Sequence, residues 1–342
     1  MNSGTEARTT ATVAVDLMGG DYAPDAAIEG CVAALEQGTH ILALGDAEAI
    51  AKLRSRGDSP NLETIECSQV ITLDDPPVSA IRHKKDSTIV RGLNAVKAGQ
   101  AGGFVSAGST GALVAGGVLI IRRAKGIDRP CLGMVLPSRS KPGVLFVDLG
   151  ASSDVRPETL VQFGLMGRIY AERVLGWDEP TVGLLNIGAE EGKGNMTARK
   201  AYSLMQAAPL NFVGNVEARD VFFGKADVVV TDGFTGNVFL KTCEGTVLFQ
   251  METIREQVDR SMRSRLGGLL MKPVFRKLGE VLDYSSYGGA PLLGLEGCVV
   301  KCHGSSGATA IANGIAQALK FISNDVASII CETISEIHRD QS

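Results

Sequence analysis

Ten short apolar runs recur along the chain, and most of them end in glycine, aspartate or serine. They are TVAVDLMGGD, HILALGD, LETIEC, GGFVSAGS, CLGMVLPS, GVLFVDLGA, TVGLLNIG, LNFVGN, ADVVVTDG and GCVVKCHGSS. Such runs are typical of strands that are buried on both faces and lead into a loop. Helix-like segments lie between many of them; over 24–37, Ile28, Cys31, Val32 and Leu35 fall on one helical face. The alternation predicts a three-layer α/β/α fold with a large, mostly parallel sheet.

Two stretches depart from this alternation. The two strands within CLGMVLPSRSKPGVLFVDLG are separated only by a polar turn that carries Pro142-Gly143, which predicts a hairpin and therefore a mixed sheet. From 242 to 283 the strand pattern stops, and we expect a protruding helical excursion. We see no linker, so we expect a disordered tail over 1–11, a single α/β catalytic domain over 12–322, and a C-terminal helix and tail over 323–342.

Composition narrows the classes of protein to consider. The 34 basic and 38 acidic residues give a net charge of −4, which does not favour binding to nucleic acid. The N-terminal MNSGTEARTT does not resemble a signal peptide, and no run approaches the roughly 20 apolar residues that cross a bilayer. Seven scattered cysteines indicate a reducing compartment. We therefore expect a cytoplasmic protein whose membrane contact, if any, is peripheral.

Several common catalytic and metal-binding patterns are missing from the sequence. The four histidines are far apart, no Cys pair has C-x-x-C spacing, and Cys298 and Cys302 lack a second pair, so a zinc site is not expected. There is no G-x-G-x-x-G motif after a strand and no G-x-S-x-G motif. These observations disfavour a Rossmann dehydrogenase and a serine hydrolase, and we expect neither a cofactor nor a metal.

Glycine makes up 41 of the 342 residues and is concentrated after the apolar runs, where backbone N–H groups can approach an anion. In VDLMGGDYAP, Asp16 ends a strand and Gly19 and Gly20 open a turn into a helix. This arrangement suits an anion at a helix N-terminus, or else forms a tight turn that Asp16 caps.

A second glycine-rich stretch, VSAGSTGALVAGG, supplies the hydroxyls of Ser106, Ser109 and Thr110, with Gly108 opening the backbone. Small hydroxyls and bare amides suit phosphate oxygens or a developing oxyanion. The alternative is that Ser109 or Thr110 only caps the following helix.

Further candidates follow three later strands. LLNIGAEEGKGN places Lys193 on a glycine loop with Asn186 nearby, although a solvated surface lysine is the alternative. VVVTDGFTGNVFLK contains Asp232 and Asn237; Asp232 either orients a partner cation or caps the next helix. In VVKCHGSSG, His303 either binds phosphate or is structural.

The segment MRSRLGGLLMKPVFRKLGE combines basic and apolar side chains closely. This density suggests a tip that rests in the lipid headgroup layer or contacts a carrier protein, while the alternative is a helix pair at a dimer interface. The residues proposed for this contact are Arg263, Arg265, Leu269, Leu270, Phe275, Arg276 and Lys277.

Taken together, DLMGGDYAPD, SAGSTGALVAGG, NIGAEEGKGN, NFVGNVEARD, DGFTGNVFLKT, GGAPLLGLEG and KCHGSS resemble the phosphate acyltransferase family of bacterial phospholipid synthesis. The likeness runs in order over 12–322. Ser109 and Ser152 stand where the family usually shows Asn.

This resemblance implies a fold similar to isocitrate and isopropylmalate dehydrogenases and to phosphotransacetylases, in a homodimer. It implies transfer of a long-chain acyl group from acyl carrier protein to inorganic phosphate, giving an acyl phosphate that a membrane-bound glycerol-3-phosphate acyltransferase would consume. The protein would then associate peripherally with the inner face of the membrane. On this basis we assign Lys193 to phosphate or the developing oxyanion, and Ser106, Ser109 and Thr110 with their backbone amides to phosphate. Asn186, Asp232, Asn237 and His303 would organise the site.

Two other functions remain open from the sequence. One is a short-chain phosphotransacetylase that uses acyl-coenzyme A, and the other is a non-catalytic scaffold that binds acyl carrier protein or lipid.

Overall fold

A computed structural model describes residues 11–139, 142–282 and 288–340. These residues divide into two compact units: a first unit within 1–130 and 288–342, and a second unit within 131–287. The tail expected over 1–11 falls almost entirely outside the described residues. The single catalytic domain expected over 12–322 stays a prediction.

The first unit is built on six strands in the order β3-β2-β1-β4-β11-β10. Parallel pairing joins β1 to β2 and β4, β2 to β3, and β11 to β4, whereas β10 pairs antiparallel with β11. The strands are β1 (Thr12–Asp16), β2 (His40–Gly45), β3 (Leu62–Glu66), β4 (Gly103–Ser106), β10 (Ala290–Leu293) and β11 (Cys298–Lys301).

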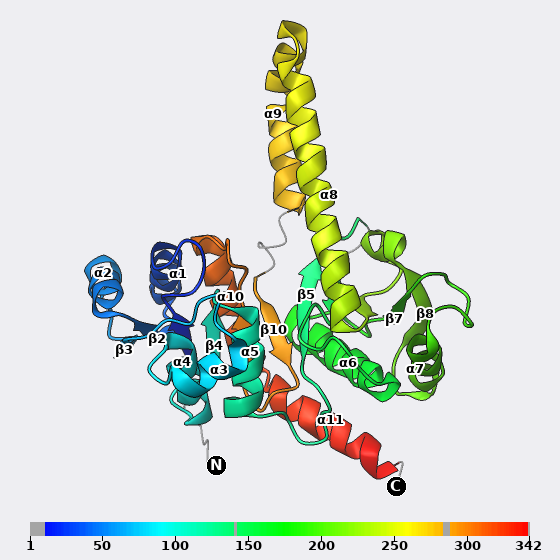
Figure 1. The fold of residues 1–342 in the computed structure, drawn as a ribbon, viewed down its shortest axis with the longest axis horizontal. Coiled ribbons are helices and arrows are strands. Elements are labelled where there is room, and N and C mark those ends of the chain that lie inside the picture. The colour runs from blue at the N-terminus through cyan, green and yellow to red at the C-terminus, as the bar shows by residue number, and fades with distance from the viewer. Residues whose placement is uncertain (1–10, 140–141, 283–287, 341–342) are drawn as a thin grey trace, which may run out of the picture. The chain divides into compact units, whose positions relative to one another are not determined.

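Helices cover both faces of these strands (Figure 1). One group packs together as α1 (Asp25–Glu36), α2 (Ala47–Gly57) and α10 (Ala308–Ser323), with α11 (Val326–Asp340) against α10. The other group comprises α3 (Pro77–His83), α4 (Thr88–Lys97), α5 (Thr110–Gly116) and the π-helix η1 (Gly117–Ile121). Because both faces are covered, the central strand β1 has no exposed face, and its residues Val13, Ala14 and Val15 are all buried.

The second unit contains five strands in the order β5-β6-β9-β7-β8. They are β5 (Cys131–Leu136), β6 (Val144–Val147), β7 (Val182–Asn186), β8 (Phe212–Glu217) and β9 (Val228–Val230). The helices are α6 (Pro157–Tyr170), the π-helix η2 (Ala171–Leu175), α7 (Met196–Ala207), the 3₁₀-helix η3 (Ala218–Phe223), α8 (Gly233–Asp259) and α9 (Met262–Leu282).

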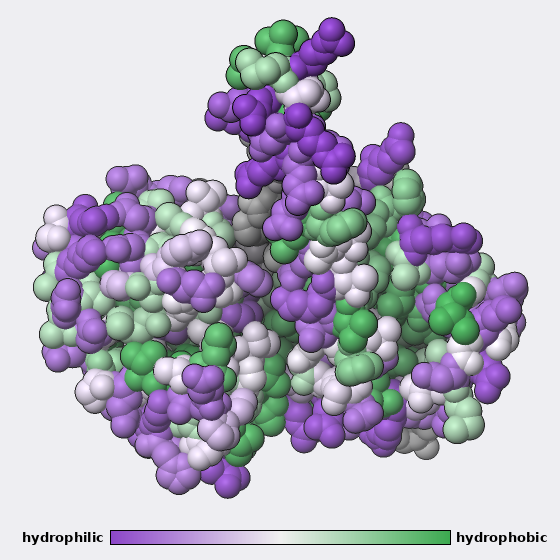
Figure 2. Space-filling view, turned by 45° about the horizontal axis from the view of Figure 1, so that its top comes forward, coloured by the Kyte–Doolittle hydropathy of each residue, from purple (hydrophilic) through white to green (hydrophobic). Residues whose placement is uncertain are grey.

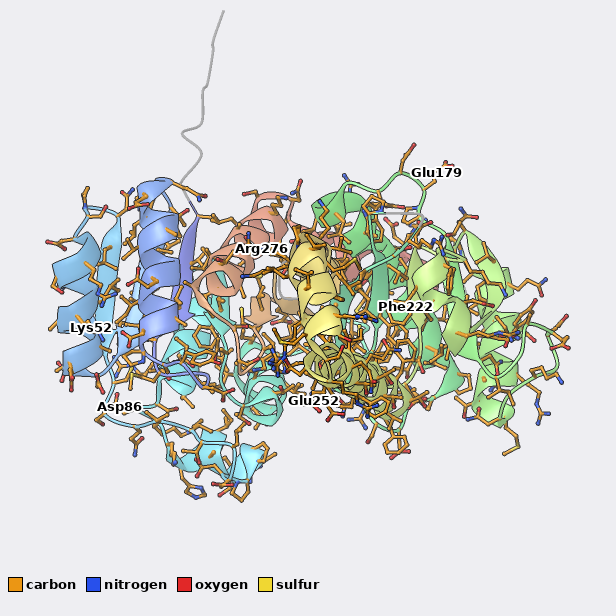
Figure 3. The ribbon with its side chains drawn as sticks, turned by 90° about the horizontal axis from the view of Figure 1, so that it is seen from above. Lys52, Asp86, Glu179, Phe222, Glu252 and Arg276 are labelled. Carbon is orange, nitrogen blue, oxygen red and sulfur yellow. The ribbon has the colours of Figure 1, made fainter. Side chains whose placement is uncertain are left out.

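The alternation of side chains along β6 places α6 and α8 on opposite faces of the second unit's strands. Leu145 and Val147 point towards Gly167 of α6. Phe146 points the other way and stacks on Phe239 of α8, with ring centroids 4.9 Å apart. Phe222 of η3, which is labelled in Figure 3, stacks on the same Phe239 ring, with ring centroids 5.9 Å apart. This aromatic stack fixes the first part of α8 on the sheet.

The rest of α8 leaves the sheet and runs beside α9 as a helical hairpin (Figure 1). After Leu240, no residue of α8 is buried, and the described side chains of α9 are likewise not buried. The helical segment expected from 242 is therefore present, but it begins earlier, at Gly233, and residue 283 lies outside the described residues.

The predicted fold class is confirmed: the protein is a three-layer α/β/α structure with mostly parallel strands. All ten apolar runs contain a strand, and β5 and β6 form the predicted antiparallel hairpin, with Leu136 opposite Val144. The strand β10 was not predicted. Its sequence, APLL, follows two glycines and contains a proline, which hides the strand pattern.

Candidate functional site

Three neighbouring parallel strands of the first unit end at the same edge. These strands are β1, β4 and β11. Their loops, residues 17–24, 107–109 and 302–307, lead into α1, α5 and α10 respectively. The carboxyl ends of parallel strands are where α/β proteins usually bind ligands. This edge is therefore the candidate site of the first unit, and we call its three loops the strand-end loops.

A buried hydrogen-bonded chain joins two of the strand-end loops. Ser106 Oγ donates to Asp16 Oδ2 at 2.7 Å and accepts from the backbone N–H of Gly108 at 2.9 Å. Asp16 Oδ1 also accepts from the N–H of Met18 at 2.9 Å. Burial raises the pKa of Asp16, and hydrogen bonds from Ser106, Thr88 and Met18 oppose that rise. Because the Ser106 proton is donated to Asp16, Ser106 positions the loop from within the protein.

Lys301, at the end of β11, was missed by the sequence reasoning. Its Nζ donates to the carbonyl oxygens of Ala107 at 2.9 Å and Gly108 at 2.6 Å. Burial lowers the pKa of Lys301 to about 8, while the negative charges of Asp16 and Asp21 oppose that fall. The sequence did carry a signal for it, because Lys301 is a single cation at the end of the apolar run VVK. His303, two residues later, was proposed in its place.

Gly19 and Gly20 let the first strand-end loop pack directly against the other two. A Cβ atom on Gly19 would lie 2.6 Å from the backbone nitrogen of Gly108. At Gly20, which has a φ of +98°, a Cβ atom would lie 2.9 Å from the carbonyl oxygen of Gly304. The N–H of Asp21 donates to that same oxygen at 2.7 Å. The three loops therefore form one interlocked backbone assembly.

Ser109 and Thr110 lie where the second strand-end loop becomes helical. Ser109 is buried, and its Oγ accepts weakly from the N–H of Ala112 at 3.4 Å. Ser109 therefore caps α5, which is one of the two roles that the sequence predicted for it. Thr110 is the first residue of α5 and is half-buried. The cap uses a lone pair of the Ser109 hydroxyl and leaves its proton to be donated. Capping and anion binding are thus compatible at this position.

His303 lies in the third strand-end loop and is half-buried. Its Nδ1 lies 2.7 Å from Ser305 Oγ and accepts from the Ser305 backbone N–H at 3.2 Å. Because a backbone N–H can only donate, Nδ1 is the unprotonated nitrogen and the neutral ring carries its proton on Nε2.

In the second unit, Asn186 holds the loop that carries Lys193. Asn186 Nδ2 donates to the carbonyl oxygen of Lys193 at 3.1 Å and to Asn215 Oδ1 at 3.0 Å. Its Oδ1 accepts from the N–H of Ile187 at 2.8 Å, and Asn215 Nδ2 donates to the carbonyl oxygen of Glu190 at 2.8 Å. Asn186 and Asn215 are buried, whereas Lys193 is exposed. Asn186 is therefore a positioning residue, and Asn215, its buried partner, was not predicted.

Asp232 caps α8, which is one of the two roles that the sequence predicted for it. Its Oδ1 accepts from the N–H of Thr235 and its Oδ2 from Thr235 Oγ1, at 2.8 and 2.7 Å. Asn237 is exposed on the first turns of α8, close to Gly150. The same turns pack on a buried carboxylate that the sequence reasoning missed, Asp148.

Asp148, which follows β6, gathers four backbone N–H groups. Its Oδ1 accepts from Leu132, Gly150 and Ala151 at 2.7, 3.2 and 3.1 Å, and its Oδ2 accepts from Ser152 at 2.7 Å. Burial raises the pKa of Asp148 to about 6 against these hydrogen bonds. Like Asp16, Asp148 ends an apolar run, so the same signal was present in VLFVDLG.

The helical hairpin carries the residues proposed for membrane or carrier contact, and apolar and charged surfaces adjoin at its free end (Figure 2). Leu269 and Leu270 are 66% and 75% exposed, whereas Phe275 is only half-buried rather than fully exposed. The basic residues Arg263, Arg265, Arg276 and Lys277 are exposed as well.

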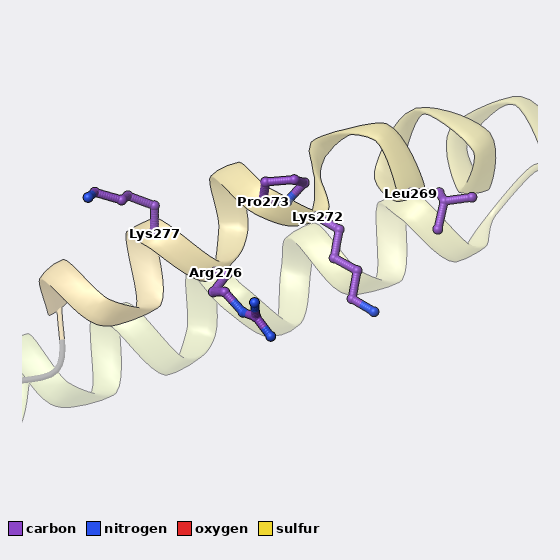
Figure 4. Close-up of a pocket in the computed structure, with 5 residues that line it drawn as sticks. All are labelled: Leu269, Lys272, Pro273, Arg276 and Lys277. Atoms are coloured by element: carbon purple, nitrogen blue, oxygen red, sulfur yellow. The ribbon is translucent and has the colours of Figure 1, made fainter. Parts of the chain in front are cut away.

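A hollow of about 420 Å³ on α9 is lined by Leu269, Lys272, Pro273, Arg276 and Lys277. Lys272 and Arg276 extend to one side of the helix, and Lys277 points away from them (Figure 4). Apolar and cationic groups therefore alternate on this exposed helix.

The predicted site residues fall into two groups, one in each unit. The first unit brings together the strand-end loops, and the second unit holds the Asn186–Lys193 loop and the start of α8. Among the residues that the structure describes, no cluster of His, Cys, Asp or Glu could hold a metal ion. Within the same ranges, no helix has the length and apolar character to span a membrane.

Comparison with known proteins identifies the family. A model described as fatty acid synthesis protein matches residues 11–329. A phosphate acyltransferase of Caldicellulosiruptor saccharolyticus is 47% identical over 328 residues, which are 94% of this chain and 98% of the relative. A phosphate acyltransferase of Clostridioides difficile is 45% identical over 331 residues, 96% of this chain and 97% of the relative.

The fold is shared with a phosphotransacetylase from Streptococcus pyogenes, at a TM-score of 0.62 and 17% identity, covering 92% of this chain and 95% of that one. This likeness confirms the expected phosphotransacetylase-like fold. The sequence likeness to the curated relatives is far closer and extends over nearly the whole length of each chain. By these matches, the chain belongs to the phosphate acyltransferase family.

Proposed function

We propose that this protein transfers a long-chain acyl group from acyl carrier protein to inorganic phosphate, giving an acyl phosphate for phospholipid synthesis. The observation that carries the proposal is the full-length likeness to relatives named phosphate acyltransferase, at 47% and 45% identity. The strand-end loops of the first unit support it, because they offer amides and hydroxyls at the edge where α/β proteins bind anions.

Phosphate would bind at the strand-end loops through the amide and hydroxyl of Ser109 and the hydroxyl of Thr110. His303, in the third strand-end loop, would help to organise this site. The half-buried cation of Lys301 offsets the negative charge of Asp16 at this edge, which would otherwise repel an anion.

The reaction needs little proton transfer. A phosphate oxygen attacks the thioester carbonyl, forming a carbon–oxygen bond, and the carbon–sulfur bond breaks to release the carrier thiolate. Phosphate near neutral pH is a mixture of monoanion and dianion, and a thiolate whose acid has a pKa of about 8.5 leaves readily. The protein's main tasks are therefore to position the two reactants and to stabilise the oxyanion.

Lys193 is the candidate for the oxyanion or the phosphate because it is an exposed cation on a loop that Asn186 holds in place. We expect Lys193→Ala to lower kcat by about 10²–10³-fold, the usual cost of losing one group that stabilises an oxyanion. The matched control is Lys200→Ala, since Lys200 is an exposed lysine of α7 that forms a surface salt bridge with Glu158 at 3.2 Å. Near-normal turnover in Lys193→Ala would remove Lys193 from the mechanism.

The donor is tested by comparing thiol release from palmitoyl-acyl carrier protein and from acetyl-coenzyme A, each with and without phosphate. The proposal predicts phosphate-dependent release from the carrier protein. Preference for acetyl-coenzyme A would instead indicate a short-chain phosphotransacetylase. Binding of the carrier without any thiol release would indicate a scaffold.

We also propose that the protein is a cytoplasmic homodimer that rests peripherally on the inner face of the membrane through the free end of the hairpin. The exposed leucines and adjacent cations support this placement, because together they suit the headgroup layer of an anionic bilayer. An amphiphilic product would then pass to a membrane-bound glycerol-3-phosphate acyltransferase. Light scattering tests the dimer.

Vesicle sedimentation tests the hairpin. Leu269→Glu and Leu270→Glu are expected to weaken binding to anionic vesicles because each places a carboxylate where an apolar side chain would enter the headgroup layer. Leu73→Glu, at a leucine of the first unit that is 80% exposed, is the matched control. Unchanged vesicle binding in both hairpin variants would contradict the contact, and acidic carrier protein in place of vesicles tests the alternative partner.

A further inference from the structure

Lys301 is the only lysine within the strand-end loops and their three strands, and its contacts are with main chain. Its Nζ bonds the carbonyl oxygens of two consecutive residues, Ala107 and Gly108, almost two hundred positions earlier in the chain. A buried ammonium group is costly unless it is paired and hydrogen-bonded. Lys301 is half-buried, and its two carbonyl contacts offset the cost of removing its ammonium group from water.

The two carbonyl contacts determine where the following amides point. In a trans peptide, the C=O of one residue and the N–H of the next point in opposite directions. Because the Ala107 carbonyl faces Lys301, the Gly108 N–H faces away, and it donates to Ser106 Oγ. Because the Gly108 carbonyl also faces Lys301, the Ser109 N–H is likewise turned to the opposite side.

The Ser109 amide therefore lies on the side of the loop away from Lys301, and the Ser109 hydroxyl, which caps α5, still has its proton to donate. Asp16 restrains the same loop from another strand, through Ser106. One cation and one carboxylate therefore determine the direction of two successive peptide groups, Ala107–Gly108 and Gly108–Ser109. None of these contacts requires a bound ligand, so the amides are oriented in advance.

We propose that Lys301 is a positioning residue for inorganic phosphate: by holding the Ala107 and Gly108 carbonyls, it orients the Ser109 amide and hydroxyl towards the anion. This inference rests on the proposed function, which supplies phosphate as the ligand. Lys301 acts through the loop and is not itself a contact of the reacting atoms.

The test uses the full-length protein with Lys301→Met, Lys301→Arg and, as a control, Lys320→Met. Lys320 is an exposed lysine in the last turn of α10. Phosphate affinity is measured by titration calorimetry, and KM for phosphate and for palmitoyl-acyl carrier protein by thiol release. Melting curves establish that each variant is folded.

We expect Lys301→Met to weaken phosphate binding and raise KM for phosphate by about tenfold, the usual cost of losing a group that orients a binding residue. KM for the thioester donor should stay unchanged, and Lys320→Met should match the unsubstituted protein. Equal changes in both KM values with a lower melting temperature would show a merely structural role and overturn the proposal, as would unchanged phosphate binding.

A pH series gives a second, independent readout. The charged groups facing Lys301 are Asp16 and Asp21, and Cys302 stays neutral in this range because burial raises its pKa to about 12. Since the pKa of Lys301 is about 8, phosphate affinity of the unsubstituted protein should fall between pH 7 and pH 9. Lys301→Arg keeps its charge over this range and should bind phosphate with less dependence on pH.

If Lys301→Met does not fold, Lys301→Arg provides the test. Phosphate affinity that depends on pH in Lys301→Arg as strongly as in the unsubstituted protein would overturn the proposal. Calorimetry also separates this inference from the proposed function. Phosphate binding that depends on Lys301 without thiol release would support the inference while contradicting the reaction, whereas no phosphate binding at all would contradict both.

Discussion

Replacing Gly236 by alanine should strongly destabilise the second unit, although alanine is the better helix former. Gly236 lies in the first turn of α8, where a Cβ atom would be 1.9 Å from the carbonyl oxygen of Asp148. Real Cβ atoms essentially never approach closer than 3.0 Å, so α8 or the Asp148 loop must move by about 1 Å. Both are fixed, the loop by four hydrogen bonds to Asp148 and the helix by the Phe239 stack.

The expected change in the free energy of unfolding combines a gain in helix propensity with a cost of overpacking. Gly→Ala in a helix interior gains about 1 kcal/mol from helix propensity. Forcing an extra carbon into a packed site costs about 1–3 kcal/mol, and more when two backbones must separate. We expect a net loss of about 3 kcal/mol, and a fall in Tm of about 6 °C for a chain of this size.

The matched control is Gly245→Ala, in the same helix, where an added Cβ atom would meet nothing within 4 Å. It should raise Tm by about 2 °C because only the propensity gain applies. Differential scanning calorimetry of both variants tests the reasoning. If Gly236→Ala melts at or above the temperature of Gly245→Ala, the close approach of α8 to the Asp148 loop is not as the structure describes.

Further predictions concern the two groups of site residues. Ser106→Ala should lower the free energy of unfolding by about 2 kcal/mol because the buried carboxylate of Asp16 loses a hydrogen-bond donor. Ser55→Ala, at an exposed serine of α2, is the control and should have little effect; thermal melting of both variants tests this. Asn186→Ala should lower kcat by roughly tenfold to a hundredfold by releasing the Lys193 loop, and faster cleavage of that loop in limited proteolysis would accompany it. The raised pKa of Asp148, about 6, means that the folded state binds this proton more tightly than the unfolded state, so stability rises as pH falls. From pH 7.5 to 5.5 the gain should be roughly 1 kcal/mol relative to Asp148→Asn, and a gain of equal size in both proteins would contradict it.

The fold was largely predictable because its central strands are covered on both faces. A strand such as β1, buried throughout, requires an uninterrupted apolar run, and that run is visible in the sequence. β10 escaped because Pro291 and the two preceding glycines resemble a loop. The early start of α8 had a local signal in Asp232, which caps the helix by accepting from the N–H of Thr235, but the sequence left open whether Asp232 was a cap or a site residue.

Site residues could be predicted from the sequence only where their neighbours in the chain define their role. Asp16 and the glycines after it were recognisable as a strand end followed by a turn. The role of Lys301 depends on a contact with residues 107 and 108, and that of Asn186 on Asn215 in another strand, so neither could be deduced from spacing. Phosphate binding by Ser106 stays a prediction, and its hydrogen bond to Asp16, a partner ninety positions away, could not be deduced from spacing.

The central claim, acyl transfer to inorganic phosphate, is tested most directly by supplying palmitoyl-acyl carrier protein with isotopically labelled phosphate and measuring both free thiol and labelled acyl phosphate. We expect labelled acyl phosphate in equal amount to the thiol released, and no thiol release when phosphate is withheld. Thiol release that continues without phosphate, or that yields free fatty acid in place of labelled acyl phosphate, would contradict it.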